Sequence, residues 1–206
     1  MKKKLLNLSK DIITKRQPNI TDDEMAVITY GLESIYLTIT KLVILLLVSI
    51  ILGITREFAL LLIIYNVIRS TAFGMHASNS TSCLIASLTI FIGGVYVCEF
   101  LDINILVKFI ICIFCLLCVY KYAPADTHKR PIVNHKKRKK FKIITLTSAT
   151  VLSILVIVLN EHIISNYLLY GMFVAVLMIL PAVYKIFKMP YNNYKNYKSV
   201  LANTEG

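Results

Sequence analysis

Long apolar runs separated by short polar breaks fill most of this chain. Most of the runs have no polar face, which indicates that lipid rather than water surrounds them. A bilayer core of ~30 Å needs ~20 residues of helix, and each run is close to that length. The pattern predicts an all-α, polytopic membrane protein with about six transmembrane helices, at residues 36–53, 57–73, 83–99, 104–121, 143–160 and 163–186.

The N-terminal residues have a different pattern. Between residues 2 and 16, leucines and isoleucines can share one helix face while lysines occupy most of the rest, which is typical of an amphipathic helix in the membrane interface. A short helix packed on the rest of the protein is compatible with the same pattern. Pro18 ends this segment, and Thr21 and Glu24 form a capping-box signature for a second helix that can continue into the first span.

The length of 206 residues favours a single domain. Within residues 1–206 we expect an amphipathic N-terminal segment at 1–20, a transmembrane core at 36–186 and a basic cytoplasmic tail at 187–206.

The basic residues are distributed unevenly along the chain. Of 23 Lys and Arg residues, six lie in residues 1–16, nine in 121–142 and four in 185–198, and the formal net charge is +12. With six spans these three segments share one side, which the positive-inside rule assigns to the cytoplasm together with both termini and the loop 74–82. The charge therefore indicates membrane orientation, with a lipid bilayer and not nucleic acid as the partner. Lys108 lies near a span end, where it can snorkel to the interface.

The second span is the most polar one, because it contains Asn66 and Arg69. A charge inside a span is costly in lipid, so it is expected to face protein or water and to mark a functional site.

A polar break follows this span and contains His76 and Cys83. On an unbroken helix, residues seven apart are separated by roughly 10 Å along the axis, so an imidazole cannot reach the thiol. If the pair acts together, the backbone must fold back between them. Gly74 can end the second span, and Ser82 or a neighbouring Ser or Thr can cap the start of the third, which places Cys83 in a first helical turn.

This arrangement suits nucleophilic catalysis. A helix N-terminus and a nearby imidazole both favour the thiolate form of a cysteine. His76 would then act as general base and later as general acid, and backbone N–H groups at the helix start could bind an oxyanion. Arg69 could stabilise negative charge or order the loop. Taken separately, a single His or Cys at such positions is more often structural.

A second polar stretch lies on the same predicted side, between Lys121 and Ile132. Asp126 could orient His76, pair with Arg69 or Arg130, or simply cap a turn. The other histidines show no metal-ligand spacing, so neither a metal nor a cofactor is expected.

Three runs carry a family resemblance: Gly74 to Cys83, Tyr122-Ala-Pro-Ala-Asp-Thr-His-Lys-Arg-Pro-Ile132, and Tyr30-Gly-Leu-Glu33. With these runs the chain resembles the accessory gene regulator B (AgrB) family over essentially the full length. The family often has Gly where this chain has Phe73.

The resemblance implies a bacterial cell-membrane cysteine endopeptidase with no cofactor, whose substrate is an AgrD-type propeptide. His76 and Cys83 would be catalytic, and the propeptide would leave as a cyclic thiolactone or lactone. A homodimer is an open option. The basic loop could bind an acidic propeptide tail or could serve topology alone; its candidate residues are Lys129, Arg130, Lys136, Lys137, Arg138, Lys139 and Lys140.

Two other classes of protein fit part of the pattern. A small transporter or channel would account for Asn66 and Arg69, and a structural membrane protein would make His76 and Cys83 incidental. Substitution of His76 or Cys83 separates these classes from a protease.

Overall fold

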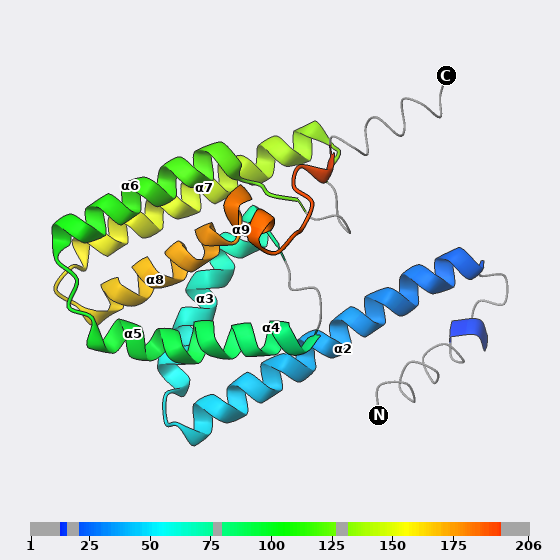
Figure 1. Ribbon diagram of the computed structural model, residues 1–206, viewed down its shortest axis with the longest axis horizontal. Helices are drawn as coiled ribbons and strands as arrows, with labels where there is room; N and C mark the ends of the chain where they lie inside the picture. The colour runs from blue at the N-terminus through cyan, green and yellow to red at the C-terminus, as the bar shows by residue number, and fades with distance from the viewer. Residues whose placement is uncertain (1–12, 16–20, 76–79, 127–131, 195–206) are drawn as a thin grey trace. The chain divides into compact units, whose positions relative to one another are not determined.

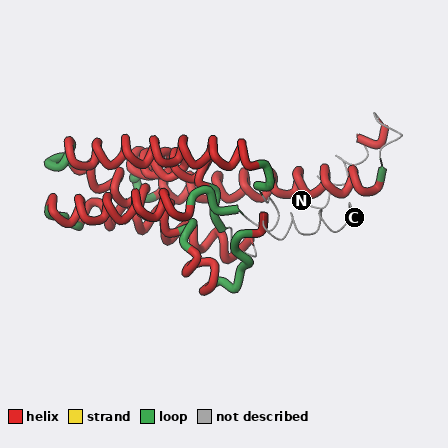
Figure 2. The backbone as a smooth tube through the Cα atoms, turned by 90° about the horizontal axis from the view of Figure 1, so that it is seen from above, coloured by secondary structure: helices red, strands yellow, loops and turns green. Residues whose placement is uncertain are grey.

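The computed structural model describes residues 13–15, 21–75, 80–126 and 132–194 (Figure 1). Helices and connecting loops account for these described residues, among which no extended strand is found (Figure 2). The chain divides into two units, residues 1–53 and residues 54–206. The predicted all-α class is confirmed.

The first unit contains one long helix, α2 (Asp22–Ile51). Its start is the predicted capping box: the Glu24 N–H donates to Thr21 Oγ1 at 3.3 Å, and the Thr21 N–H donates to the Glu24 carboxylate at 3.1 Å. The helix then continues without a break through the first predicted span. The predicted amphipathic segment 1–20 lies mostly outside the described residues.

The second unit begins with α3 (Thr55–Ala72), followed by one long helical run that changes type twice along its length. The run consists of α4 (Ser80–Ser87), the π-helical segment η1 (Leu88–Gly93) and α5 (Gly94–Phe100). The remaining helices are α6 (Ile105–Tyr122), α7 (His135–Val158), α8 (Ile163–Leu177) and the short α9 (Pro181–Ile186).

Four of these helical segments are long and apolar enough to cross a membrane: Glu24–Ile51, Thr81–Phe100, Ile105–Tyr122 and His135–Val158. The helices α3 and α8 complete the six apolar segments of the predicted pattern. α8 is apolar but has only 15 residues, and α3 carries Arg56, Glu57 and Arg69. The protein is therefore an all-α polytopic membrane protein.

α8 is the central helix of the second unit and packs against α3, α5, α6 and α7. Nine of its 15 residues are buried, so protein rather than lipid surrounds it and a short helix suffices. Gly171 allows a close approach to α3, because a Cβ atom at this position would lie 2.7 Å from Ile64 Cγ2. Small residues permit the same close approach between helices in membranes generally.

Two predicted boundaries are wrong. Residues 135–142 were expected in a loop, but they form the first two turns of α7, which Asn134 caps by accepting the Lys137 N–H at 3.1 Å. The predicted sixth span, 163–186, ends at Leu177 instead. Three residues then turn the chain, and Pro181 starts α9, where its missing N–H costs no helical hydrogen bond.

Lys108 does not snorkel to the interface as expected. Its side chain is buried, and Nζ donates to the Asn160 carbonyl and to Ser165 Oγ, both at 3.0 Å. The ammonium group thereby binds the turn between α7 and α8, where carbonyl groups at the end of α7 favour a cation.

Candidate active site

At one end of the second unit, backbone hydrogen bonds join three loops to one another. The Gly74 N–H donates to the Ala125 carbonyl at 2.8 Å, and the Ala125 N–H donates to the Ala72 carbonyl at 2.9 Å. The Met75 N–H donates to the Met178 carbonyl at 3.1 Å. We call residues 72–75, 123–126 and Met178 the three-loop junction; it connects the C-terminal ends of α3, α6 and α8.

Arg69, in the last turn of α3, braces this junction. Its Nη2 atom donates to the Gly74 carbonyl at 3.1 Å and also to the Met75 carbonyl. Its Nη1 atom is buried and has no hydrogen-bond partner among the described residues. The Arg69 guanidinium thus hydrogen-bonds to the residues that begin the loop after α3, and its Nη1 atom lies next to Gly74. The other polar residue of the span, Asn66, is exposed and bonds the Leu62 carbonyl of its own helix.

Phe73 and Gly74 turn the chain sharply after α3. Both have a positive φ, 57° and 107°. This conformation favours glycine, so Phe73 occupies a backbone position that a residue with a side chain rarely adopts. At Gly74 a Cβ atom would lie 2.2 Å from Arg69 Nη1 and 2.5 Å from the Met178 carbonyl oxygen. Glycine is thus required by both the backbone conformation and the close approach of Arg69.

His76 directly follows the junction in the sequence, but residues 76–79 lie outside the described part of the chain. The predicted contact between His76 and Cys83 therefore stays a prediction.

Cys83 lies where the sequence predicted, in the first turn of a helix. α4 begins at Ser80, and the Cys83 side chain is half-buried in the described structure. Ser82 is exposed in the same turn. The Cys83 carbonyl accepts the Ser87 hydroxyl at 2.8 Å, so this carbonyl is already bonded within the helix.

Tyr65 links the Arg69 side of the site to the Cys83 helix. Its ring packs edge-on against Phe91 of η1, with ring centroids 5.1 Å apart. Its hydroxyl is close enough to the Arg69 guanidinium and the Cys83 thiol to interact electrostatically with both. Sequence analysis missed Tyr65, although its position four residues before Arg69 places both side chains on one helix face.

The π-helical segment η1 determines which way Cys83 faces. On an uninterrupted α-helix, the side chains of Cys83 and the fully buried Val95 would point about 120° apart. One π-turn accommodates an extra residue and reduces this angle to about 20°. The Tyr170 hydroxyl of α8 donates to the Ile90 carbonyl of η1 at 3.1 Å and holds the segment in place.

Asp126 binds a distant segment of the chain, a partner that none of the sequence-based alternatives named. It is fully buried, and its two carboxylate oxygens accept the backbone N–H groups of Asn193 at 3.1 Å and Tyr194 at 2.7 Å. The described contacts of Asp126 thus bind the C-terminal segment to the three-loop junction.

The basic candidates separate into three groups. Lys129 and Arg130 lie outside the described residues. Arg138 stacks on the Tyr194 ring, with 3.8 Å between the guanidinium carbon and the ring centroid. The remaining four are exposed on the first turns of α7: Lys136, Lys137, Lys139 and Lys140.

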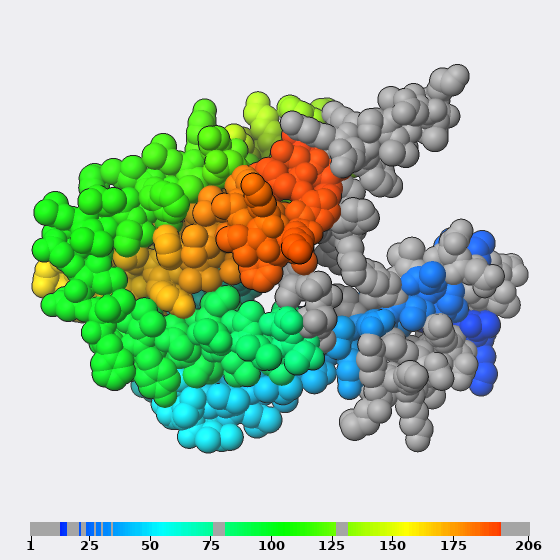
Figure 3. Space-filling view, viewed as in Figure 1, coloured from blue at the N-terminus to red at the C-terminus, as the bar shows by residue number. Residues whose placement is uncertain are grey.

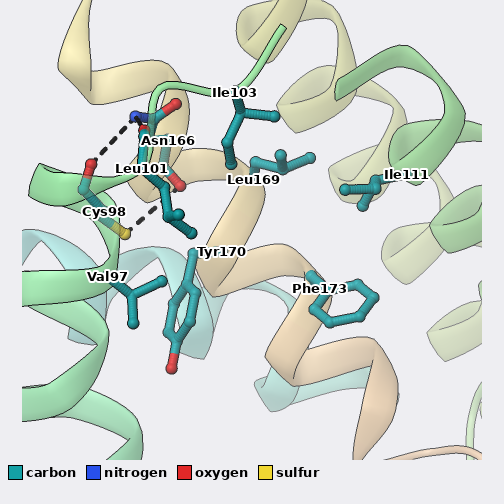
Figure 4. Close-up of a pocket in the computed structure, with 9 residues that line it drawn as sticks. All are labelled: Val97, Cys98, Leu101, Ile103, Ile111, Asn166, Leu169, Tyr170 and Phe173. Carbon is teal, nitrogen blue, oxygen red and sulfur yellow. Dashed lines mark hydrogen bonds between the residues drawn. The ribbon is translucent and has the colours of Figure 1, made fainter. Parts of the chain in front are cut away.

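A cavity of about 90 Å³ lies at the other end of the unit, between α5, α6 and α8 (Figure 4). Its lining is almost entirely apolar. Asn166 closes one side by donating to the carbonyls of Cys98 at 3.0 Å and Leu101 at 2.9 Å. None of the sequence-predicted site residues lines this cavity.

The fold and the junction define a class: a polytopic membrane protein with an arginine-braced polar junction and a cysteine at a helix start. A model of accessory gene regulator B (AgrB) matches residues 7–179. A protein of Clostridium acetobutylicum described as AgrB-like is 32% identical over 181 residues, which cover 86% of this chain and 85% of that protein. An AgrB-like protein of Listeria innocua is 27% identical over 171 residues, which cover 83% of this chain and 84% of that protein.

The chain belongs to the accessory gene regulator B family and therefore has a role in the agr quorum-sensing system. No solved structure gives a significant match.

The Tyr170→Phe variant tests the role of η1. Loss of the hydroxyl leaves the Ile90 carbonyl without this donor, which favours relaxation of η1 toward an α-helix. Cys83 then rotates off the buried face, and we expect its alkylation by a maleimide, followed by peptide mass spectrometry, to become several-fold faster. Tyr96→Phe on the exposed face of α5 is the matched control and should react like the wild type. Equal rates in all three proteins would show that the Tyr170 hydroxyl does not set the Cys83 orientation.

Proposed function

We propose that this protein is a membrane-embedded cysteine endopeptidase that cleaves an AgrD-type propeptide near its C-terminus and promotes cyclisation of the remaining peptide. The observation that carries the proposal is the half-buried position of Cys83 in the first turn of α4, together with its electrostatic interaction with Tyr65 of α3, which also interacts with Arg69. Arg69 in turn braces the loop that continues into His76. In this proposal His76 is the base that acts on Cys83.

Cleavage begins when the Cys83 sulfur attacks the scissile carbonyl carbon and its proton passes to His76. The tetrahedral oxyanion is stabilised by N–H groups at the start of α4 and by the buried Arg69 Nη1 donor. His76 then protonates the amine of the C-terminal fragment, the C–N bond breaks, and a thioester joins the propeptide to Cys83.

Cyclisation releases the peptide from this thioester. A cysteine or serine side chain within the propeptide attacks the thioester carbonyl, its proton passes to His76, and the Cys83 thiol is regenerated. Exchange of one thioester for another is nearly neutral in energy, whereas hydrolysis is strongly downhill. The site must therefore exclude water and hold the internal nucleophile close to the carbonyl.

The proposal includes an orientation in the cytoplasmic membrane with both termini in the cytoplasm. Its support is the clustering of charge at the junction end of the second unit, where α7 begins with a run of basic residues and Arg138 meets Tyr194. The propeptide would reach Cys83 from the inner leaflet.

Cys83→Ser and His76→Ala test the enzyme activity directly. In membranes that contain the protein and its propeptide, both variants should lose cleavage by at least about a hundredfold, because each group takes part in bond formation. The readout is the C-terminal fragment, together with an acyl adduct on Cys83 in the wild type. Cys98→Ser, at a buried thiol distant from the junction, is the matched control. Normal cleavage by correctly inserted Cys83→Ser protein would refute the protease and favour a transporter, channel or structural protein.

The exposed lysines of α7 offer a surface for an acidic propeptide tail. Replacing Lys136, Lys137, Lys139 and Lys140 by Gln should raise KM for an acidic-tailed propeptide roughly tenfold and leave kcat nearly unchanged, because exposed ion pairs contribute up to about 1 kcal/mol each. The difference should shrink at high salt.

The matched control for this experiment replaces the exposed Lys185 and Lys188, which lie outside α7. Membrane topology is checked in both variants. Unchanged KM in a correctly oriented α7 variant would mean that these lysines serve topology and do not bind the tail.

A further inference from the structure

The described chain ends with a segment that returns to the three-loop junction. After α8, the orange-to-red residues lie over the end of the bundle where α7 begins (Figure 3). Tyr184 of α9 is almost fully buried, and its hydroxyl donates to the Asp126 carbonyl at 3.0 Å. Its ring packs edge-on against Tyr191, with centroids 5.1 Å apart. We call Tyr184, Tyr191, Asn193 and Tyr194 the C-terminal clamp.

Asp126 is the residue that the clamp holds. A buried carboxylate is costly unless donors satisfy it, and the two backbone N–H groups from Asn193 and Tyr194 supply one donor to each oxygen. The Asn193 side chain closes the turn by donating to the Pro190 carbonyl at 2.9 Å. Arg138 covers the Tyr194 ring from α7. The clamp is therefore bonded to Asp126 and packed against the start of α7.

Burial raises the pKa of both Tyr184 and Tyr191. The two phenols therefore remain neutral near neutral pH, and Tyr184 remains a hydrogen-bond donor to Asp126.

The clamp is connected to the candidate active site through Asp126 and Ala125. Asp126 is bonded through the chain to Ala125, whose carbonyl accepts the Gly74 N–H and whose N–H donates to the Ala72 carbonyl. Gly74 and Met75 are the residues whose carbonyls bind Arg69, and His76 is the next residue in the sequence. A shift of Asp126 would thus move the backbone that carries both the Arg69 contacts and His76.

We propose that the C-terminal clamp positions the active site through Asp126, which acts as a positioning residue and not as a third catalytic group. This inference rests on the proposed function, since it assigns the clamp to the same reaction. The alternative is that Asp126 acts on His76 directly, in which case the clamp would be dispensable.

A double-variant cycle separates the two roles of Asp126. The variants are Asp126→Ala, a chain that ends at Met189, and both changes together. Each single change should lower kcat for propeptide cleavage about tenfold or more, with KM within about twofold, because the site is displaced but the docking surface of α7 remains. Since both changes break the same link, the combined variant should be no slower than the slower single variant.

Two controls match these variants. Asp102→Ala removes an exposed carboxylate from the loop between α5 and α6, and a chain that ends at Tyr194 keeps every described contact of the clamp. Both should cleave like the wild type. If the chain ending at Met189 cleaves normally while Asp126→Ala is inactive, Asp126 acts directly and the proposal is overturned. If the losses of kcat from the two single changes multiplied in the combined variant, the proposal would be overturned as well.

Hydrogen exchange tests the clamp without reference to catalysis. In inserted protein, the amides of Gly74, Met75 and Ala125 should exchange at least about tenfold faster in the chain ending at Met189 and in Asp126→Ala, and at the wild-type rate in both controls. Unchanged exchange in the shortened chain would overturn the clamp. If the wild-type protein showed no cleavage dependent on Cys83, the proposed function would fail, while the exchange result would still decide whether the clamp orders the junction.

Discussion

The half-buried guanidinium of Arg69 is the constraint on which the site depends. A charge at the end of α3 cannot be left without partners in an apolar bundle, and the backbone carbonyls of Gly74 and Met75 supply them. To present these carbonyls, the chain must reverse with positive φ at Phe73 and Gly74. The same reversal directly precedes His76 in the sequence, and the described chain resumes at Ser80, the first residue of α4.

The rest of the second unit keeps this arrangement rigid. α8 supplies the Met178 carbonyl for the junction at one end, and Tyr170 bonds the π-helical segment farther along the same helix. One central helix therefore supports both the loop before His76 and the helix that carries Cys83. Gly171 lets α3 pack closely on α8, so that Arg69 is fixed relative to the junction.

Much of the fold could be predicted from the sequence, because apolar runs, the Thr21 capping box and the serines before Cys83 are local signals. The helical start of α7 was not predicted because a run of lysines is typical of an exposed loop. In the structure Asn134 caps these residues as the first turns of a helix. The end of α8 was misplaced because the residues after it are also apolar. Lys108, Tyr65, Tyr170 and the partners of Asp126 depend on contacts between distant segments, and no local pattern predicts them.

The most direct test of the account is a cross-link between positions 76 and 83. A disulfide needs Cα atoms about 4.4–6.8 Å apart, a separation that an unbroken helix does not allow for residues seven apart. The His76→Cys variant in native membranes should form an intramolecular disulfide with Cys83 under mild oxidation, identified as a linked peptide pair by mass spectrometry. If both thiols react readily with a maleimide but no such disulfide forms, the two side chains do not meet and the proposed catalytic pair is wrong.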